Sequence, residues 1–370
     1  MTPKNAPSGI QNLNGAFLRA KLLTWYQTHE RPLPWRVLWK KHKNPWHIWV
    51  SEIMLQQTVI KAVLPVYERF LTEFPSPSSL AAANPEDIRL AVRGLGYYRR
   101  FDLLHKACVK LSDEKRSLPS AYGDWLALPG VGTYTASAIS SITGDEPQGV
   151  VDGNVERVLC RLLDIRSEPN LPHLKKEFKK FMDDICALGN PGAINQAVME
   201  LGQTICSPSS PLCAKCPVKN QCLAFANSSQ TLAPAAKART KFLDVNLRLE
   251  IAASACEVQL LRRPPDAKFL KGTWGFQTWI QSEGANGGCW IIDGSPTKPS
   301  SNRALKSIGS IRHSITKHKI TAEVVFRTPG KAPGNSDAKT VSPRDVERHL
   351  VSNLDRKAWS FYLKSQGIQL

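Results

Sequence analysis

The chain has 370 residues, 42% of them hydrophobic, which is enough for two or three domains with buried cores. It carries 49 lysine and arginine residues against 31 aspartate and glutamate residues, and the formal net charge of +18 favours a polyanionic partner such as nucleic acid. A basic but merely solvated surface is the alternative that charge alone leaves open. No apolar run is long enough to span a membrane, and residues 1–15 contain no apolar leader segment. We therefore expect a cytoplasmic protein with a disordered N-terminus over residues 1–15.

The first 225 residues are typical of helices joined by turns. The prolines at 32 and 34 end the first helix, and the basic segment 37–46 that follows is irregular in pattern. Apolar residues recur at helical spacing in the segments 16–26, 47–60, 60–74, 77–104, 154–163, 175–185 and 195–203. The sequence thus predicts an all-α domain over residues 16–225.

Glu52 stands among apolar neighbours in the predicted helix 47–60. One interpretation places it on the solvent face of an amphipathic helix. The other places it in an apolar pocket, where burial raises the pKa of the carboxyl group and makes it a general acid near neutral pH. The sequence alone does not decide between them.

Residues 94–100, GLGYYRR, join two predicted helices and combine close backbone approach with aromatic and cationic side chains. Such a turn suits DNA, because tyrosine stacks on or wedges between bases and arginine meets phosphate. Core and cap roles for the same residues are the alternative.

A second glycine turn, residues 128–132 (LPGVG), also precedes a helix-compatible segment. A turn of this kind presents unpaired backbone N–H groups that suit a phosphate, although most such turns bind nothing. Asp152 follows before Gly153, where it has two interpretations: the N-cap of the next helix, or a lone functional carboxylate.

Four of the nine cysteines crowd into residues 206–222 with the spacing C-x6-C-x2-C-x5-C. Four thiolates this close can hold a zinc ion or a [4Fe-4S] cluster, and the uneven spacing with a single C-x2-C favours iron and sulfur. The predicted ligands are Cys206, Cys213, Cys216 and Cys222.

Beyond residue 225 the character of the sequence changes. Residues 226–244 are small, polar and basic and are predicted to form an interdomain linker. Strand-length apolar segments follow at 247–263, 288–294 and 319–329, and a capped helix is predicted to begin at Ser342. The chain is therefore predicted to end in an α+β domain over residues 245–370.

Several motifs, taken together and in order, resemble those of the helix-hairpin-helix DNA glycosylases, and in particular the adenine DNA glycosylases of the MutY type. The motifs are LPWR (33–36), SEIMLQQT (51–58), GLGYYRR (94–100), LPGVGTYT (128–135), VDGNVERV (151–158) and the four-cysteine loop. The resemblance covers residues 16–225 and, more loosely, the C-terminal part. It implies an all-α helix-hairpin-helix glycosylase domain with a [4Fe-4S] loop, followed by a Nudix-like lesion-recognition domain.

The resemblance also implies a catalytic set. Glu52 matches the glutamate that protonates adenine at N7, and Asp152 matches the aspartate that stabilises the oxocarbenium ion or attacks the sugar. Tyr134 and Asn154 match residues that support that chemistry. Glycosidic cleavage needs an acid for the leaving base and an anion beside the developing positive charge, so the residue types fit.

Other positions match residues that contact the flipped adenine and the DNA. The adenine pocket is matched by Leu33, Trp35, Arg36 and Gln196, and it must exist because the target base leaves the duplex. Gln57 and Tyr97 match residues that fill the gap and wedge beside the opposing base. The hairpin amides of Gly130, Val131 and Gly132 match a phosphate site that can also hold a monovalent cation. The implied partner is double-stranded DNA with adenine opposite 8-oxoguanine or guanine, bound by a monomer.

Tyr134 separates this interpretation from its nearest alternative. Endonuclease III-like glycosylase/lyases, which act on oxidised pyrimidines, carry a lysine nucleophile at the corresponding position. A tyrosine cannot form the Schiff base that drives strand cleavage. The sequence therefore favours a monofunctional glycosylase.

The C-terminal part departs most from the family pattern. His313, Ser314, Thr316 and Lys317 fall where the family has its lesion-reading loop, but Ile315, Thr316 and Lys317 replace the family's Phe, Ser and His. Residues 37–44 form an insertion at the rim of the implied pocket. No Nudix-box spacing of glutamates occurs from residue 247 onward, so nucleotide hydrolysis is not expected.

Overall fold

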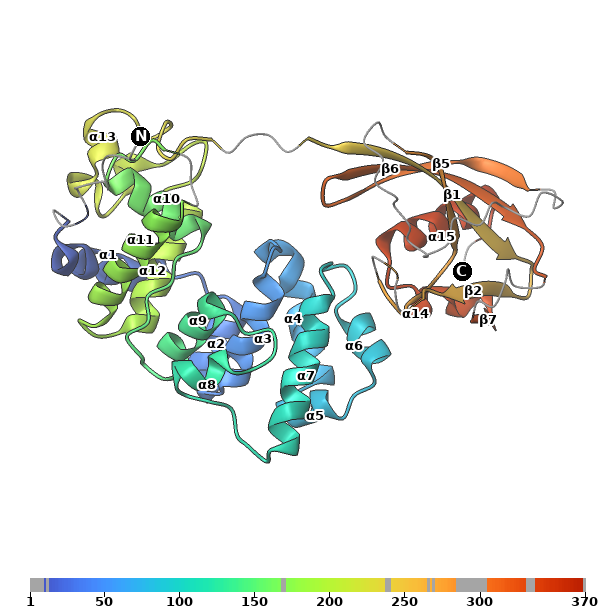
Figure 1. Cartoon of the computed structure of the whole chain (residues 1–370), viewed down its shortest axis with the longest axis horizontal. Helices are drawn as coiled ribbons and strands as arrows, with labels where there is room; N and C mark the ends of the chain where they lie inside the picture. Colours follow the sequence, from blue (N-terminus) through green and yellow to red (C-terminus); the bar gives the residue numbers. More distant parts are fainter. Residues whose placement is uncertain are drawn as a thin grey trace. The chain divides into compact units, whose positions relative to one another are not determined.

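The computed structural model describes residues 10, 13–167, 171–236, 241–264, 267, 270–283, 305–330 and 337–368. The chain divides into two compact units: residues 1–82 with 99–238, and residues 83–98 with 239–370 (Figure 1). The predicted disorder over residues 1–15 falls mostly on positions outside the described residues. The predicted strand 288–294 lies entirely outside them.

The first unit is built of helices, as predicted. Their bounds are α1 (Gly15–His29), α2 (Pro34–His42), α3 (Pro45–Leu55), α4 (Ile60–Glu73), α5 (Pro77–Ala81), α7 (Arg99–Asp113), α8 (Tyr122–Leu126), α9 (Thr133–Thr143), α10 (Gly153–Leu162), α11 (Pro172–Cys186), α12 (Pro191–Thr204) and α13 (Leu223–Ala226).

Local sequence explains where these helices begin. The side chains of Asn14, Asn44, Ser76 and Asp152 each accept a backbone hydrogen bond at an N-cap, and proline opens α2, α3, α5, α11 and α12. Two predicted boundaries were wrong. Residues 37–42, expected to be irregular, continue α2, whose basic last turn complements the negative C-terminal end of the helix dipole. The helix expected to reach residue 60 ends at Leu55.

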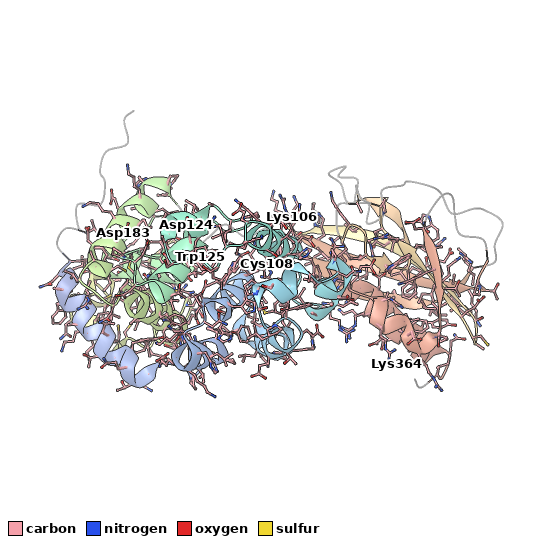
Figure 2. All side chains as sticks on the ribbon, turned by 90° about the horizontal axis from the view of Figure 1, so that it is seen from below. Lys106, Cys108, Asp124, Trp125, Asp183 and Lys364 are labelled. Carbon is pink, nitrogen blue, oxygen red and sulfur yellow. The ribbon has the colours of Figure 1, made fainter. Side chains whose placement is uncertain are left out.

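The hydrophobic core of the first unit fixes the position of α3. Trp46 and Trp49 of α3 are fully buried, and the ring of Trp49 packs edge-on against Trp125 of α8 with centroids 5.1 Å apart; Figure 2 labels Trp125. Burial of each such side chain contributes about 1.5–3 kcal/mol. Large aromatic side chains therefore anchor the buried face of α3.

The described residues of the second unit form a mixed seven-stranded sheet with helices, which fits the predicted α+β class. Its elements are α6 (Pro85–Ala91), β1 (Leu243–Ala253), β2 (Val258–Arg262), β3 (Trp274–Gly275), β4 (Gln277–Glu283), β5 (Lys306–Ile315), β6 (His318–Arg327), β7 (Ala338–Val341), α14 (Val346–His349) and α15 (Asn353–Ser365). The strand order is β3-β2-β1-β6-β5, with β4 paired to β1 and β7 paired to β2. β1 and β6 are parallel, whereas β5 and β6 form an antiparallel hairpin.

Helix α15 packs on this sheet (Figure 1). Its buried side chains are Leu354, Ala358, Trp359 and Tyr362, and they join the apolar faces of β1 and β6 in one core. A buried ion pair, Arg263 Nη2 to Asp355 at 2.6 Å, ties the helix to the β2–β3 connection. Asp355 also accepts from the backbone N–H of Phe276 at 3.1 Å, so its charge is fully paired.

Candidate active site

Glu52 lies on α3 and is buried, with only 9% of its surface exposed. Of the two interpretations of this glutamate, the structure supports the apolar pocket and not the solvent face. Burial raises the pKa of its carboxyl group to about 7, and the nearby charge of Asp152 acts in the same direction. The guanidinium of Arg36 and a hydrogen bond from Tyr134 oppose this increase in pKa. The carboxyl group is therefore partly protonated at neutral pH, as a general acid requires.

Tyr134 is the second residue of α9, directly after the glycine turn. Its hydroxyl group donates a hydrogen bond to Glu52 and lies 3.6 Å from Met199 Sδ. Burial, followed by the charges of Glu52 and Asp152, raises the pKa of the Tyr134 hydroxyl well above its ordinary value. The hydroxyl thus remains protonated and acts as a donor to Glu52.

Asp152 is the N-cap of α10, as one of its two interpretations predicted. Its Oδ1 accepts from the backbone N–H groups of Asn154 at 2.9 Å and Val155 at 2.8 Å, and its Oδ2 accepts from Asn154 Nδ2 at 2.8 Å. Its charge also raises the pKa of Glu52, so the two carboxyl groups are close enough to interact electrostatically. The cap bonds fix the orientation of the carboxylate without neutralising it, and both roles are compatible.

Asn154 connects Asp152 to the start of the cysteine loop. Its Oδ1 accepts from Arg157 Nη2 at 2.9 Å, and the same guanidinium donates to the carbonyl groups of Gly202 at 2.7 Å and Cys206 at 2.8 Å. A Cβ at Gly202 would lie 2.7 Å from Asn154 Cβ, so this glycine allows α12 to approach α10 closely. A continuous set of hydrogen bonds therefore runs from the Asp152 carboxylate to the backbone of Cys206.

The four predicted pocket residues come from α2 and α12. Arg36 is buried and donates through Nε to Gln196 Oε1 at 3.0 Å and through Nη2 to Glu200 Oε2 at 3.0 Å. Leu33, at the N-cap of α2, and Trp35 are also buried. The guanidinium of Arg36 lowers the pKa of Glu52, so Arg36 lies close enough to Glu52 to interact electrostatically.

The glycine turn links α8 to α9 as a helix-hairpin-helix. Gly130 has φ +78°, and a Cβ there would lie 2.6 Å from Leu103 Cβ, so only glycine fits. Val131 is buried, and Gly132 is the N-cap of α9 with open space beside it. The first backbone N–H groups of α9 face that space without intrahelical partners, which is the arrangement that binds phosphate.

Gln57 and Tyr97 are presented on tight turns of the first and second units respectively. Gln57 is exposed at φ +55° between α3 and α4, where Arg100 donates to the Gln56 carbonyl and, at 2.9 Å, to the Thr58 hydroxyl. Tyr97 is 50% exposed at φ +48°. A left-handed conformation at these side chains is costly and is typical of functional sites.

The four-cysteine loop follows α12 and packs on the end of α10. Arg161 holds its start: Nη1 donates to Cys206 Sγ at 3.2 Å and to the Ser207 carbonyl at 2.7 Å. Burial raises the pKa of Cys216 to about 12; a backbone hydrogen bond from Val218 opposes this increase, and the charges of Cys206, Cys222 and Cys213 add to it. Within the described part of the chain, no three His, Cys, Asp or Glu side chains take up a metal-binding arrangement.

The predicted lesion-reading residues lie at the β5–β6 hairpin, but they do not share one surface. Ser314 and the turn residues Thr316 and Lys317 are exposed, with Thr316 at φ +52°. His313 is half-buried and lines a cleft against α15. Side chains alternate along a strand, and this alternation separates His313 from Ser314.

Sequence reasoning missed two residues of the site. Glu200 is 1% exposed and binds both Arg31 and Arg36, and Arg157 holds Asn154. Glu200 lies in the segment AVMELGQ, so it carries the same signal as Glu52: a single carboxylate in an apolar helix. Arg157 carried no such signal, because its bonds to the distant carbonyl groups of Gly202 and Cys206 cannot be inferred from its neighbours in sequence.

Comparison with known proteins agrees with this geometry. Residues 50–183 match the model of the HhH-GPD superfamily base excision DNA repair proteins. The chain is 41% identical over 213 residues to the adenine DNA glycosylase of Mus musculus, covering 56% of this chain and 41% of that protein. It is 33% identical over 305 residues to the adenine DNA glycosylase of Arabidopsis thaliana, covering 73% of this chain and 48% of that protein. The chain therefore spans less than half the length of these relatives.

Among solved structures, a thermostable thymine-DNA glycosylase superposes with a TM-score of 0.52 at 23% identity, covering 59% of this chain and 99% of that one. The superposition shows the fold of the helical unit, and residues 50–183 are similar to the HhH-GPD superfamily base excision DNA repair proteins. Within that class the chain resembles the adenine DNA glycosylases. In the described residues, no helix is long and apolar enough to cross a membrane.

Proposed function

We propose that this protein is a monofunctional adenine DNA glycosylase of base excision repair, which removes adenine opposite 8-oxoguanine or guanine and leaves an abasic site. The observation that carries the proposal is the buried Glu52, whose pKa is raised to about 7 by burial and by the nearby charge of Asp152. Two carboxyl groups with different environments can serve as the acid and the anion of glycosidic cleavage. The similarity to adenine DNA glycosylases supports adenine as the base.

The chemistry follows from these two groups. Glu52 in its protonated form donates a proton to N7 of the flipped adenine, and the N-glycosidic bond breaks with its electrons passing to the base. The positive charge that develops on the sugar is stabilised by Asp152, whose carboxylate is already oriented by Asn154 and the start of α10. Water then adds to the sugar carbon, and its proton is taken up by a carboxylate.

The neighbouring residues position the base and hold the acid. Arg36, fixed by Gln196 and Glu200, together with Leu33 and Trp35, lines the proposed adenine pocket. Tyr134 orients Glu52 through its hydroxyl group. The backbone N–H groups of the 130–132 turn would bind a DNA phosphate, and its carbonyl groups a monovalent cation. Gln57 and Tyr97 would fill the gap left by the flipped base.

Strand cleavage is not expected from this site. A glycosylase/lyase of the endonuclease III type needs a lysine amine to form a Schiff base, and Tyr134 occupies the corresponding position. Borohydride trapping of a covalent enzyme–DNA adduct would favour that alternative over the proposed function.

The residue types at 206–222 suit a [4Fe-4S] cluster, because four thiol groups lie in one loop and Arg161 contacts the first of them, although the described side chains do not take up a metal-binding arrangement. Cys206, Cys213, Cys216 and Cys222 would hold the cluster, which when bound would supply a one-electron redox centre and cross-link the loop. The purified protein should then be brown with visible absorption, whereas a zinc protein is colourless. Substituting one of the four cysteines by serine should remove the colour.

The second unit would serve as a Nudix-like domain that reads the base opposite adenine. The exposed β5–β6 turn supports this role, since Ser314 and Thr316 present hydroxyl groups to solvent. The proposal as a whole is tested by incubating purified protein with a duplex that contains adenine opposite 8-oxoguanine. Release of free adenine, with strand breaks only after alkali treatment, is the expected result. A protein that binds this duplex and releases no base would contradict it.

A further inference from the structure

The second unit contains a cleft of about 650 Å³ between β5 and α15, a size typical of ligand sites. One wall is a single stripe of α15 at spacings of three and four residues, opposite to the buried face of the helix. The stripe consists of Asn353, Arg356, Lys357, Ser360, Phe361 and Lys364. The other wall is formed by Ile311, Arg312 and His313 of β5.

The backbone of β5 is shaped to form this cleft. Gly309 has φ +135°, and a Cβ there would lie 2.8 Å from Phe361 Cζ, so the phenyl ring closes on the strand only because residue 309 is glycine. The register of β5 against β6 shifts at this point, which is the mark of a β-bulge. Beyond the bulge, Lys357 Nζ donates to the Arg312 carbonyl at 3.1 Å and ties the two walls together.

The charges that line the cleft are strongly unbalanced. Arg356, Lys357 and Lys364 of α15 contribute three cations, and Glu347 contributes the one carboxylate among the described lining residues. Glu347 lies 3.7 Å from Arg356 Nη2 and offsets only part of this charge. Burial and the ammonium group of Lys357 lower the pKa of His313, while Asp355 opposes this, which agrees with a positive environment. Lys357 and Lys364 are exposed cations of the cleft, and Figure 2 labels Lys364.

We infer that this cleft is a phosphate-binding site, which takes either the phosphodiester backbone of DNA or the phosphate groups of a free nucleotide. The arginine and lysine side chains of the α15 wall, together with Ser360 and Asn353 of the same wall, present several N–H and O–H donors to the oxygen atoms of a phosphate group. The ladder pairs Ile315 with His318 at the hairpin turn, so the cleft begins two residues from the exposed turn at Thr316. The inference does not depend on adenine removal, because it concerns phosphate groups and not bases.

The test uses the full chain and binding alone. Lys357→Gln and Lys364→Gln, singly and combined, remove two exposed cations of the α15 wall, and Ser360→Asp places a negative charge on the same wall. Arg344→Gln is the matched control, since Arg344 is an exposed arginine of the same unit outside the cleft. Binding of an undamaged duplex is measured by fluorescence anisotropy over a salt series, and binding of inorganic pyrophosphate by calorimetry.

If the phosphate belongs to DNA, the slope of log K against log salt should become shallower by about 0.9 for each phosphate group that a cleft variant no longer neutralises, and should not change in the control. If it belongs to a free nucleotide, pyrophosphate should bind the wild type and bind the double variant at least about fivefold more weakly. Ser360→Asp should weaken the binding of whichever of the two ligands the cleft takes, although this variant removes no cation. The inference is overturned if neither ligand distinguishes the cleft variants from Arg344→Gln. Because the duplex contains no target base, failure here leaves the proposed glycosylase activity unaffected.

Discussion

The Tyr134 hydroxyl donates a hydrogen bond to the Glu52 carboxyl group, so the side chain that follows the hairpin helps to set the proton affinity of a carboxyl group on α3. This bond favours the ionised form of Glu52 and lowers its pKa against the larger effect of burial. Tyr134 therefore connects the proposed phosphate-binding turn with the proposed general acid.

Replacing Tyr134 by phenylalanine should raise the pKa of Glu52 above about 7, because one interaction that favours the carboxylate is removed. Base removal needs protonated Glu52, so activity falls as pH rises through that pKa. The alkaline limb of the single-turnover rate against pH should consequently move to higher pH in Tyr134→Phe. Tyr122→Phe, on α8, is the control and should leave the limb in place. If the alkaline limb does not move in either variant, the hydrogen bond does not change the pKa of Glu52.

Glu52→Gln should stabilise the protein at alkaline pH. The folded pKa of about 7 exceeds the ordinary value of 4.5, so the carboxyl group favours the folded state below pH 4.5 relative to alkaline pH. That contribution is lost as pH rises through about 7. At pH 8 the buried carboxylate lowers the free energy of unfolding by about 3 kcal/mol. Urea unfolding at pH 8 should therefore show a higher free energy of unfolding for Glu52→Gln than for wild type. The gap should close by about pH 4, and the exposed control Glu68→Gln should show none at either pH.

Asp152→Asn should keep the fold but lose base removal. Asparagine is as good an N-cap as aspartate, so the bonds to the start of α10 persist and stability should change by less than about 1 kcal/mol. The anion beside the developing positive charge is lost, and the rate of base release should fall at least about 100-fold. Single-turnover kinetics and thermal unfolding measured together check this. Loss of rate with an equal loss of stability would point to capping as the main role of Asp152.

Arg157→Leu should disturb the site and the cysteine loop together. The variant leaves the carbonyl groups of Gly202 and Cys206 and the amide of Asn154 without their charged donor, and the free energy of unfolding should drop by about 2–4 kcal/mol. If the loop holds a cluster, visible absorption per chain should fall as well. Arg116→Gln, an exposed arginine, is the control and should change neither quantity. A cluster content equal to that of wild type would show that the cysteine loop does not depend on the hydrogen bonds of Arg157.

Periodicity and turn chemistry predicted the helical first part, the change to strands after residue 240 and the placement of Asp152 at a helix start, because each depends on neighbours in sequence. Glu52 shows where local reasoning ends. Its burial follows from the tryptophan cluster of α3 and α8 and from Arg36, which are far apart in the chain. The end of α3 at Leu55 was missed for the same reason, since Arg100 of α7 holds the Gln56 carbonyl. The cleft beside α15 depends on the residue stripe of that helix and on the close approach of the helix to Gly309. Helical spacing in the sequence indicates the stripe, but nothing in the sequence indicates the close approach.

The central claim is that buried, protonated Glu52 delivers a proton to adenine. It is tested most directly by the single-turnover release of free adenine from a duplex with adenine opposite 8-oxoguanine, for wild type and Glu52→Gln. The wild type should release adenine with a rate that falls above about pH 7, and Glu52→Gln should bind the duplex with unchanged affinity while its rate falls by about 100- to 10,000-fold. Release of adenine by Glu52→Gln at the wild-type rate would contradict the account.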